Sequence, residues 1–228
     1  MKYIKLTTLI LTLLLLACNQ TNNETTSLTE QETLSEEKTI SEEKKLSSTD
    51  DKKQIQNLIR QTLNWAESKN TIDLVPAITD SADSIYIGLN LNKHKQNVDK
   101  LKSTNFFSKE FIENYNQIII TIDKGLRNGK YEQWFVGDLP PFIFANDVDP
   151  WCNCQDNEDW NKVEVRVIKL NENEGELEWI WGNLSTDAHN SWKNFAYNFK
   201  VVKENGKWKI AYLKGFDFKE STRIDGQL

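Results

Sequence analysis

The feature that most constrains the fold is a change in the spacing of apolar residues near residue 160. Before this point they recur every three or four positions in residues 52–69 and 111–126, which is typical of amphipathic helices. After it they alternate with polar residues, which is typical of strands with one buried face. Helices first and strands second predict an α+β fold, with N-terminal helices packed on one face of a curved antiparallel sheet of about four strands. The strands are expected within residues 162–170, 176–182, 191–202 and 207–213.

Local signals refine the helical half. Asp50 and Asp51 are predicted to cap the first helix, and Ser108 the last, because their side chains can accept hydrogen bonds from the first turn. Between these two helices we expect a short strand over residues 85–88 and a short polar helix over residues 92–104.

Strand parity predicts which side chains share the buried face of the sheet, because successive side chains point to opposite faces. Asn205 and Gly206 are expected to form the tight turn between the last two strands, since both tolerate positive φ angles. The residues predicted on the buried face are Val163, Val165, Val167, Leu177, Trp179, Trp181, Phe195, Tyr197, Phe199, Val201, Trp208, Ile210 and Tyr212.

The N-terminus has the features of an export signal. Two lysines precede an apolar run over residues 6–16, and Ala17 then stands before Cys18. The run is shorter than the roughly 20 residues of a membrane-spanning helix, so residues 1–17 are interpreted as a signal peptide. The sequence "LLAC" resembles the bacterial lipobox, which implies diacylglycerol on the Cys18 sulfur. An ordinary signal peptide or an uncleaved anchor is the alternative.

Composition divides the rest of the chain. Residues 18–50 are rich in Ser, Thr, Glu, Asn and Lys and contain no aromatic residue, so they are predicted to be a disordered tether. The α+β domain is expected over residues 51–222, followed by a C-terminal tail over residues 223–228.

The net charge of −6 comes without a basic patch, so nucleic acid is not an expected partner. An acidic chain gains nothing from anionic lipid, so the membrane is expected to hold it through the N-terminal acyl group. The sequence contains no P-loop, G-x-S-x-G, H-E-x-x-H or G-x-G-x-x-G pattern. We therefore predict no cofactor and no catalytic residue.

Several longer stretches resemble known families. The ending "ENGKWKIAYLKGFDF" (204–218) resembles the last hairpin of the nuclear-transport-factor-two-like (cystatin-like) fold. The stretches "LKSTNFFSKEFIENY", "WFVGDLPPF" and "DPWCNCQD" resemble an uncharacterised family of lipoproteins of the Bacteroidetes, over most of residues 51–220. The resemblance implies a cone of helices against a bent sheet. It implies no particular activity, because this fold serves enzymes, carriers and binding partners alike.

The loop "ANDVDPWCNCQDNEDW", residues 145–160, combines five carboxylates, two tryptophans and a Cys-x-Cys pair. We interpret it as a structural connection across the open end of the sheet that also rims a binding pocket. Its tryptophans are expected to anchor it, and its glutamine to hydrogen-bond the backbone. The residues predicted at the pocket rim are Asp147, Asp149, Trp151, Gln155, Asp156 and Trp160.

The Cys-x-Cys pair has two interpretations. Export favours oxidation, and lipidation of Cys18 leaves Cys152 and Cys154 as partners only for each other. Residues i and i+2 of an extended chain lie about 6.5–7 Å apart, at the limit of disulfide geometry, and a bend at Pro150 would bring them closer. We expect either a structural disulfide or two unreactive thiols, since the setting of a redox C-x-x-C motif is missing.

The same loop offers oxygen ligands for Ca²⁺, but the EF-hand pattern is absent. Zinc would need further ligands from His94 and His189, so no metal is predicted. Both histidines occur in polar surroundings and are expected to be solvated. Trp179 and Trp181 offer a stacking surface for a sugar, although packing against the helices is the preferred interpretation, and strand parity makes Trp192 the exposed aromatic.

Three functions remain open at this stage. The preferred one is a non-enzymatic, lipid-anchored domain that binds a small ligand or a protein of the cell envelope. The alternatives are a small hydrolase or isomerase with buried carboxylates, and a structural envelope protein without a pocket. Asn19 replaces the Asp of a common inner-membrane retention signal, which favours the outer membrane.

Overall fold

The structure is a computed structural model and describes residues 49–68, 72–155 and 159–226, which belong to one compact unit. The predicted signal peptide, Cys18, the tether up to residue 48 and Asp156 lie outside these residues. The described part is α+β, with helices and two antiparallel sheets, so the predicted fold class is confirmed. In these residues no helix has both the length and the apolar character needed to cross a membrane.

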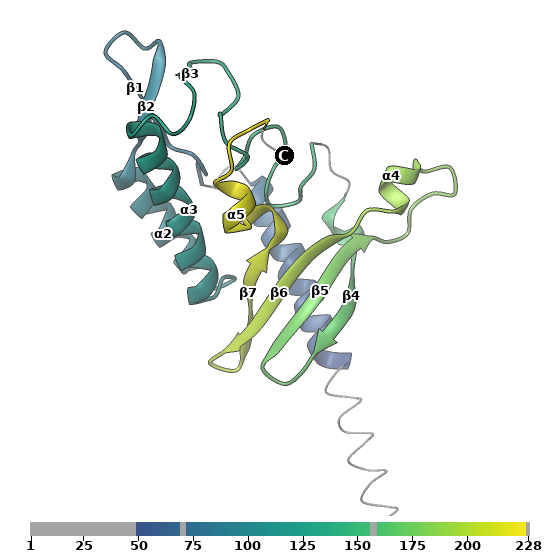
Figure 1. Cartoon of the computed structure of the whole chain (residues 1–228). Helices are drawn as coiled ribbons and strands as arrows, with labels where there is room; N and C mark the ends of the chain where they lie inside the picture. The colour runs from purple at the N-terminus through teal and green to yellow at the C-terminus, as the bar shows by residue number, and fades with distance from the viewer. Residues whose placement is uncertain (1–48, 69–71, 156–158, 227–228) are drawn as a thin grey trace, which may run out of the picture. The chain divides into compact units, whose positions relative to one another are not determined.

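Four antiparallel strands form the larger sheet in the order in which they follow along the chain (Figure 1). This arrangement confirms the predicted meander. The strands are β4 (Val163–Leu170), β5 (Glu174–Trp181), β6 (Tyr197–Glu204) and β7 (Lys207–Leu213).

The predicted strand over residues 191–202 is wrong in its first half. There the chain forms the single helical turn α4 (Asn190–Lys193), because His189 Nδ1 accepts a hydrogen bond from Ser191 N at 3.2 Å and caps the turn. As a result Trp192 is half-buried against Trp181, with ring centroids 5.4 Å apart, instead of standing free on the sheet.

A second, three-stranded sheet was not predicted apart from its central strand. In this sheet β2 lies between two very short strands, which are too short to show an alternating pattern. The strands are β1 (Ala77–Thr79), β2 (Ile85–Leu89) and β3 (Trp134–Phe135).

Within the described residues, three longer helices precede the larger sheet. One covers residues 49–67, and α2 (Leu91–Thr104) and α3 (Lys109–Arg127) follow. The predicted cap of α3 is confirmed, since Ser108 Oγ accepts a hydrogen bond from Phe111 N at 3.2 Å. Short helical turns complete the chain: η1 (Trp160–Lys162), η2 (Lys214–Phe216) and α5 (Phe218–Ser221).

The predicted cap at Asp50 and Asp51 is wrong, because both residues are already helical. Asp51 Oδ1 instead accepts hydrogen bonds from Trp208 Nε1 at 2.7 Å and from Lys203 Nζ at 3.1 Å. These bonds hold the start of the helix over residues 49–67 against the end of the sheet that carries the β6–β7 turn.

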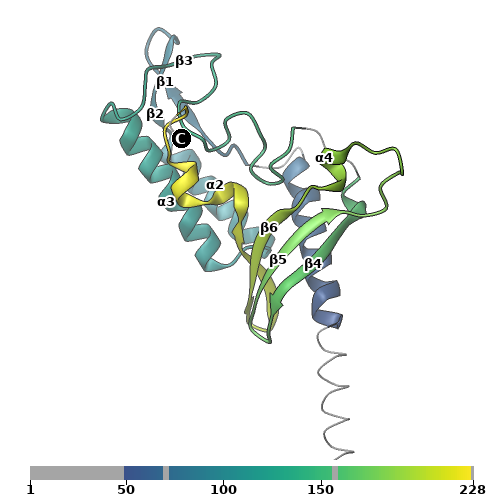
Figure 2. The same ribbon diagram turned by 45° about the vertical axis from the view of Figure 1, so that its right-hand side comes forward.

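The helix over residues 49–67 crosses one face of the larger sheet (Figures 1 and 2). Its side chains also bond the edge strand β4. Gln56 Oε1 accepts a hydrogen bond from Val165 N at 3.1 Å, and Arg60 Nε donates to Val163 O at 2.8 Å. The opposite edge, β7, pairs with residues 106–108 just before α3. Both edges are therefore shielded over part of their length from pairing with another chain.

Aromatic side chains fill the space between the sheet and the helices. Trp151 contacts Trp65, Phe107, Phe111 and Phe216, with ring centroids between 4.6 and 6.2 Å apart. The tryptophans of β5 are buried as well, which confirms that they pack in the core. The residues of the four strands that are buried on this face are Val163, Val165, Leu177, Trp179, Trp181, Tyr197, Phe199, Val201, Trp208, Ile210 and Leu213. The prediction that Val167 is buried with them is wrong, since this residue is 41% exposed.

A bulge in β7 overturns the predicted position of Tyr212. Val201 pairs with Ile210 and Lys200 pairs with Tyr212, so Ala211 is the extra residue and strand parity changes there. Leu213 takes the buried position, and Tyr212 turns to the opposite side of the strand, where it lines a cleft.

The prediction of a solvated His94 is also wrong. Its side chain lies between α2 and α3 with 4% of the residue exposed, and its Nε2 is 3.0 Å from Asn116 Oδ1. Among the described residues nothing hydrogen-bonds its Nδ1. Burial lowers the pKa of His94, and the hydrogen bond to Asn116 only partly opposes this effect. His189, by contrast, is exposed as expected.

We expect stability to fall as the pH drops below about 6.5, the ordinary pKa of histidine. There the unfolded chain takes up a proton that native His94 resists, so the stability present above that pH is progressively lost. Urea unfolding at pH 7.5 and pH 5 would measure the loss, and His94→Gln should reduce it while His189→Gln should not. An identical pH dependence in wild type and His94→Gln would contradict the assignment.

Candidate functional site

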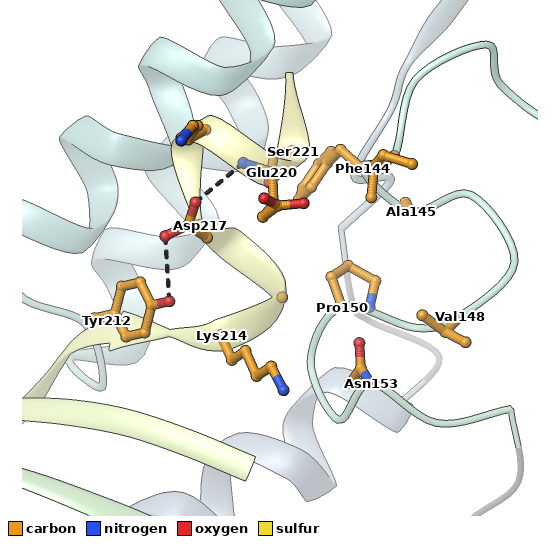
Figure 3. Close-up of a pocket in the computed structure, with 13 residues that line it drawn as sticks. Phe144, Ala145, Val148, Pro150, Asn153, Tyr212, Lys214, Asp217, Glu220 and Ser221 are labelled. Atoms are coloured by element: carbon orange, nitrogen blue, oxygen red, sulfur yellow. Dashed lines mark hydrogen bonds between the residues drawn. The ribbon is translucent and has the colours of Figure 1, made fainter. Parts of the chain in front are cut away.

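A cleft of about 500 Å³ lies between the loop over residues 143–153 and the segment that follows β7 (Figure 3). The loop side is mainly apolar, and the opposite side carries charges of both signs. The two walls are named here the loop wall, with Phe144, Ala145, Val148 and Pro150, and the charged wall, with Tyr212, Lys214, Asp217 and Glu220.

The loop wall owes its course to a compact turn. Asn153 has a φ of 53°, which reverses the chain between the two cysteines. Asp149 N donates to Cys154 O at 3.0 Å, and a disulfide joins Cys152 to Cys154, whose Cα atoms are 5.2 Å apart. The sequence left open whether Cys152 and Cys154 form a disulfide or remain two thiols, and the structure contains the disulfide.

Trp151 fixes this turn to the core, with 3% of the residue exposed. Its ring lies among aromatic residues of three different elements, as described above. The neighbouring Pro150 is buried as well, and Val148, which is exposed, presents an apolar side chain to the cleft.

The charged wall is built by the turn from β7 into α5. Asp217 Oδ1 caps α5 by accepting a hydrogen bond from Glu220 N at 3.0 Å, while its Oδ2 accepts one from the Tyr212 hydroxyl at 3.3 Å (Figure 3). Burial, followed by the nearby Asp217 carboxylate, raises the pKa of Tyr212, so this hydroxyl remains protonated. Lys214 and Glu220 are exposed and line the cleft. The Glu220 carboxylate is also paired with Arg223, whose Nη2 lies 3.1 Å from Glu220 Oε2.

Tyr197 joins the two walls. Its hydroxyl donates to Pro150 O at 2.6 Å and accepts from Gly215 N at 2.8 Å. Burial raises the pKa of Tyr197 far above its usual value, so the hydroxyl always carries its proton. Gly215 lies so close to Pro150 that a Cβ atom there would be 2.6 Å from Pro150 Cα. The width of the cleft is therefore set by buried backbone contacts.

The loop carboxylates lie on the other side of the loop wall. Asp147, Asp149 and Trp151 line a more open cleft of about 480 Å³, together with Leu74 and Leu139. The carboxylates serve the loop itself: Asp149 Oδ1 accepts from Trp151 N at 2.9 Å, and Asp147 Oδ1 accepts from Gln155 Nε2 at 3.1 Å. Desolvation by the loop raises the pKa of the Asp149 carboxyl, and the bond from Trp151 N opposes this rise.

The remaining predicted rim residues are separated from these. Gln155 lines a third cleft, beside α4. Trp160 is buried and anchors the end of the loop, because its Nε1 donates to Glu67 Oε2 at 2.7 Å. Asp156 lies outside the described residues. Within the described part of the chain, His, Cys, Asp and Glu side chains form no group of three or more suited to a metal ion.

No family model, curated protein or solved structure matches the chain. The site is therefore interpreted from its own geometry. The sequence singled out the loop over residues 145–160, but none of the predicted rim residues that the structure describes lines the first cleft, and the charged wall was not predicted. The segment "LKGFDF" supplies Lys214 and Asp217, and the sequence predicted there only the end of the last strand.

Proposed function

We propose that the chain is a lipid-anchored lipoprotein of the cell envelope, held in the outer membrane by Cys18, whose folded domain binds a partner without catalysis. The domain would hang on the tether over residues 18–50. We further propose that it is a variant of the nuclear-transport-factor-two-like cone, of the kind suggested by the Bacteroidetes lipoproteins it resembles. In support, a helix crosses the face of a four-stranded meander, as that fold requires.

The observation that carries a binding function is the contrast between the filled interior and the open cleft. Trp151 and its aromatic neighbours occupy the space in which a cone-shaped fold would enclose a ligand, so a ligand has to bind outside it. The cleft between the loop wall and the charged wall offers apolar surface at Val148 and the half-buried Ala145, beside the charge of Lys214 and the Glu220–Arg223 ion pair. This combination suits a peptide segment of an envelope protein that carries one apolar and several charged side chains.

The enzymatic alternative requires a carboxylate held among apolar walls without a partner. Among the described residues the buried carboxylates do not meet this condition, and the desolvated Asp149 carboxylate also has a partner, since it accepts from Trp151 N at 2.9 Å. Asp51 is bonded to Trp208 and Lys203, and Asp123 accepts from Leu89 N at 2.7 Å and from Arg127 Nε at 2.9 Å. These contacts favour structural roles for both groups.

Anchoring is tested by Cys18→Ala. We expect the wild-type chain to sediment with membranes and to carry an acylated Cys18 in mass spectra of its N-terminal peptide. The variant should accumulate as a precursor or appear in the soluble fraction. A mature wild-type chain with an unmodified first residue, recovered from the culture fluid, would refute the proposal.

Binding at the cleft is tested by affinity capture from envelope extracts. Val148→Asp places a carboxylate on the loop wall and should remove a partner that the wild type retains, because a charge buried in an apolar contact is costly. Ile168→Asp is the matched control, since Ile168 is an exposed apolar residue of β4, 56% exposed. Equal capture by both variants would exclude the cleft as the binding site.

A further inference from the structure

A third cleft, of about 300 Å³, lies between the disulfide turn and α4. It differs from the first in its chemistry, because the described residues that line it are all uncharged although 27% of the chain is charged. Three of these residues are aromatic, and most of the others carry amide or hydroxyl groups. They are Trp181, Trp192, Phe195, Asn153, Gln155, Ser191 and Cys154.

The aromatic part is a firmly supported platform. Trp192 and Phe195 are half-buried, so each keeps part of its ring surface accessible. Trp192 lies on Trp181 with centroids 5.4 Å apart, and Trp181 in turn stacks on Trp160 at 5.4 Å and an interplanar angle of 18°. Trp160 and Trp181 are buried, and the rings of Trp192 and Phe195 pack against Trp181. The latter two rings therefore have little freedom to turn away from a ligand.

Polar groups lie at the border of this platform. Gln155 Nε2 is held by Asp147 Oδ1 at 3.1 Å, which leaves its Oε1 without a hydrogen bond among the described residues. Ser191 Oγ is 2.8 Å from His189 Nδ1, which orients the hydroxyl. The Asn153 amide also makes no side-chain hydrogen bond within the described part of the chain, and this residue stands at the boundary with the first cleft. Donors and acceptors are thus available beside the rings.

We propose that this cleft binds a ring of a neutral saccharide. A pyranose presents an apolar C–H face, which can lie on Trp192 and Phe195, and a border of hydroxyl groups, which can bond Gln155 and Ser191. A charged ligand would lose its hydration without meeting an opposite charge among the described lining residues, and a fully apolar ligand would cover the amides without bonding them. The site is separate from the cleft proposed above for a protein partner and does not depend on it.

Calorimetric titration of the folded chain with cellotriose, maltotriose and N,N′-diacetylchitobiose tests the proposal, with N-acetylneuraminic acid as a charged probe. We expect at least one neutral probe to bind with a submillimolar Kd, and Trp192→Ala to weaken it at least tenfold. Phe135→Ala, at an exposed aromatic residue of β3, and Val148→Asp, in the first cleft, should leave the affinity unchanged. Gln155→Ala, at an exposed position, should weaken binding several-fold and decides the matter should Trp192→Ala fail to fold.

Three results would overturn the proposal. The first is no heat with any neutral probe at millimolar concentration. The second is unchanged affinity in both Trp192→Ala and Gln155→Ala. The third is binding of N-acetylneuraminic acid that is as tight as that of the neutral probes, or tighter. None of these results would bear on the capture of a protein partner at the first cleft. Val148→Asp changes the first cleft alone, because Val148 does not line the third.

Discussion

Replacing Trp151 by alanine is expected to lower the free energy of unfolding by about 4 kcal/mol. The ring is buried and contacts Trp65, Phe107, Phe111 and Phe216, so its removal leaves a large cavity where the helices, the loop and η2 meet. Urea unfolding monitored by far-ultraviolet circular dichroism would measure the change.

The matched control is Phe135→Ala, since Phe135 is an aromatic residue with 50% exposure. Its removal should change the free energy of unfolding by no more than about 0.5 kcal/mol. A loss below about 1 kcal/mol for Trp151→Ala would mean that the loop does not depend on this anchor.

Gly215→Ala is expected to destabilise the fold by about 3 kcal/mol. The added Cβ would overlap Pro150 O and lie 2.7 Å from Pro150 C, and neither is the flexible end of a side chain. Relief of this overlap requires the loop wall and the charged wall to move apart. That movement would stretch the hydrogen bonds of the Tyr197 hydroxyl to Pro150 O and Gly215 N.

The Tm of Gly215→Ala, compared with the Tm of Lys214→Ala, would show whether the contact between Gly215 and Pro150 is as close as described. Lys214 is exposed and adjacent in sequence, so its variant should unfold near the wild-type temperature. A Gly215→Ala protein with an unchanged Tm would contradict the fixed spacing of the two walls.

Periodicity alone predicted the larger sheet and the helices before it, because long amphipathic segments carry a repeated signal. It failed where a single residue changes the register. Ala211 forms a bulge that no pattern in "KWKIAYL" announces, and this bulge moves Tyr212 from the core to the cleft. It failed again at His94, since burial of a polar helix face depends on Asn116 of a different helix.

The two walls of the first cleft also differ in how much of them the sequence indicates. The loop over residues 145–160 could be singled out because Trp151, Cys152 and Cys154 are distinctive in sequence, but the residues of the loop wall itself were not among the predicted rim residues. The charged wall could not, since Lys214, Asp217 and Glu220 resemble ordinary surface residues until the Tyr197 hydroxyl brings their segment against Pro150. That contact joins residues 47 positions apart, a separation beyond the reach of local patterns.

The most direct test of the central claim is photo-cross-linking in intact cells, with a benzophenone amino acid at position 148 or at position 168. The account predicts one dominant adduct with an envelope protein from position 148, lost when Lys214→Glu is added, and no such adduct from position 168. The same adducts from both positions, or none from position 148, would contradict binding at this cleft.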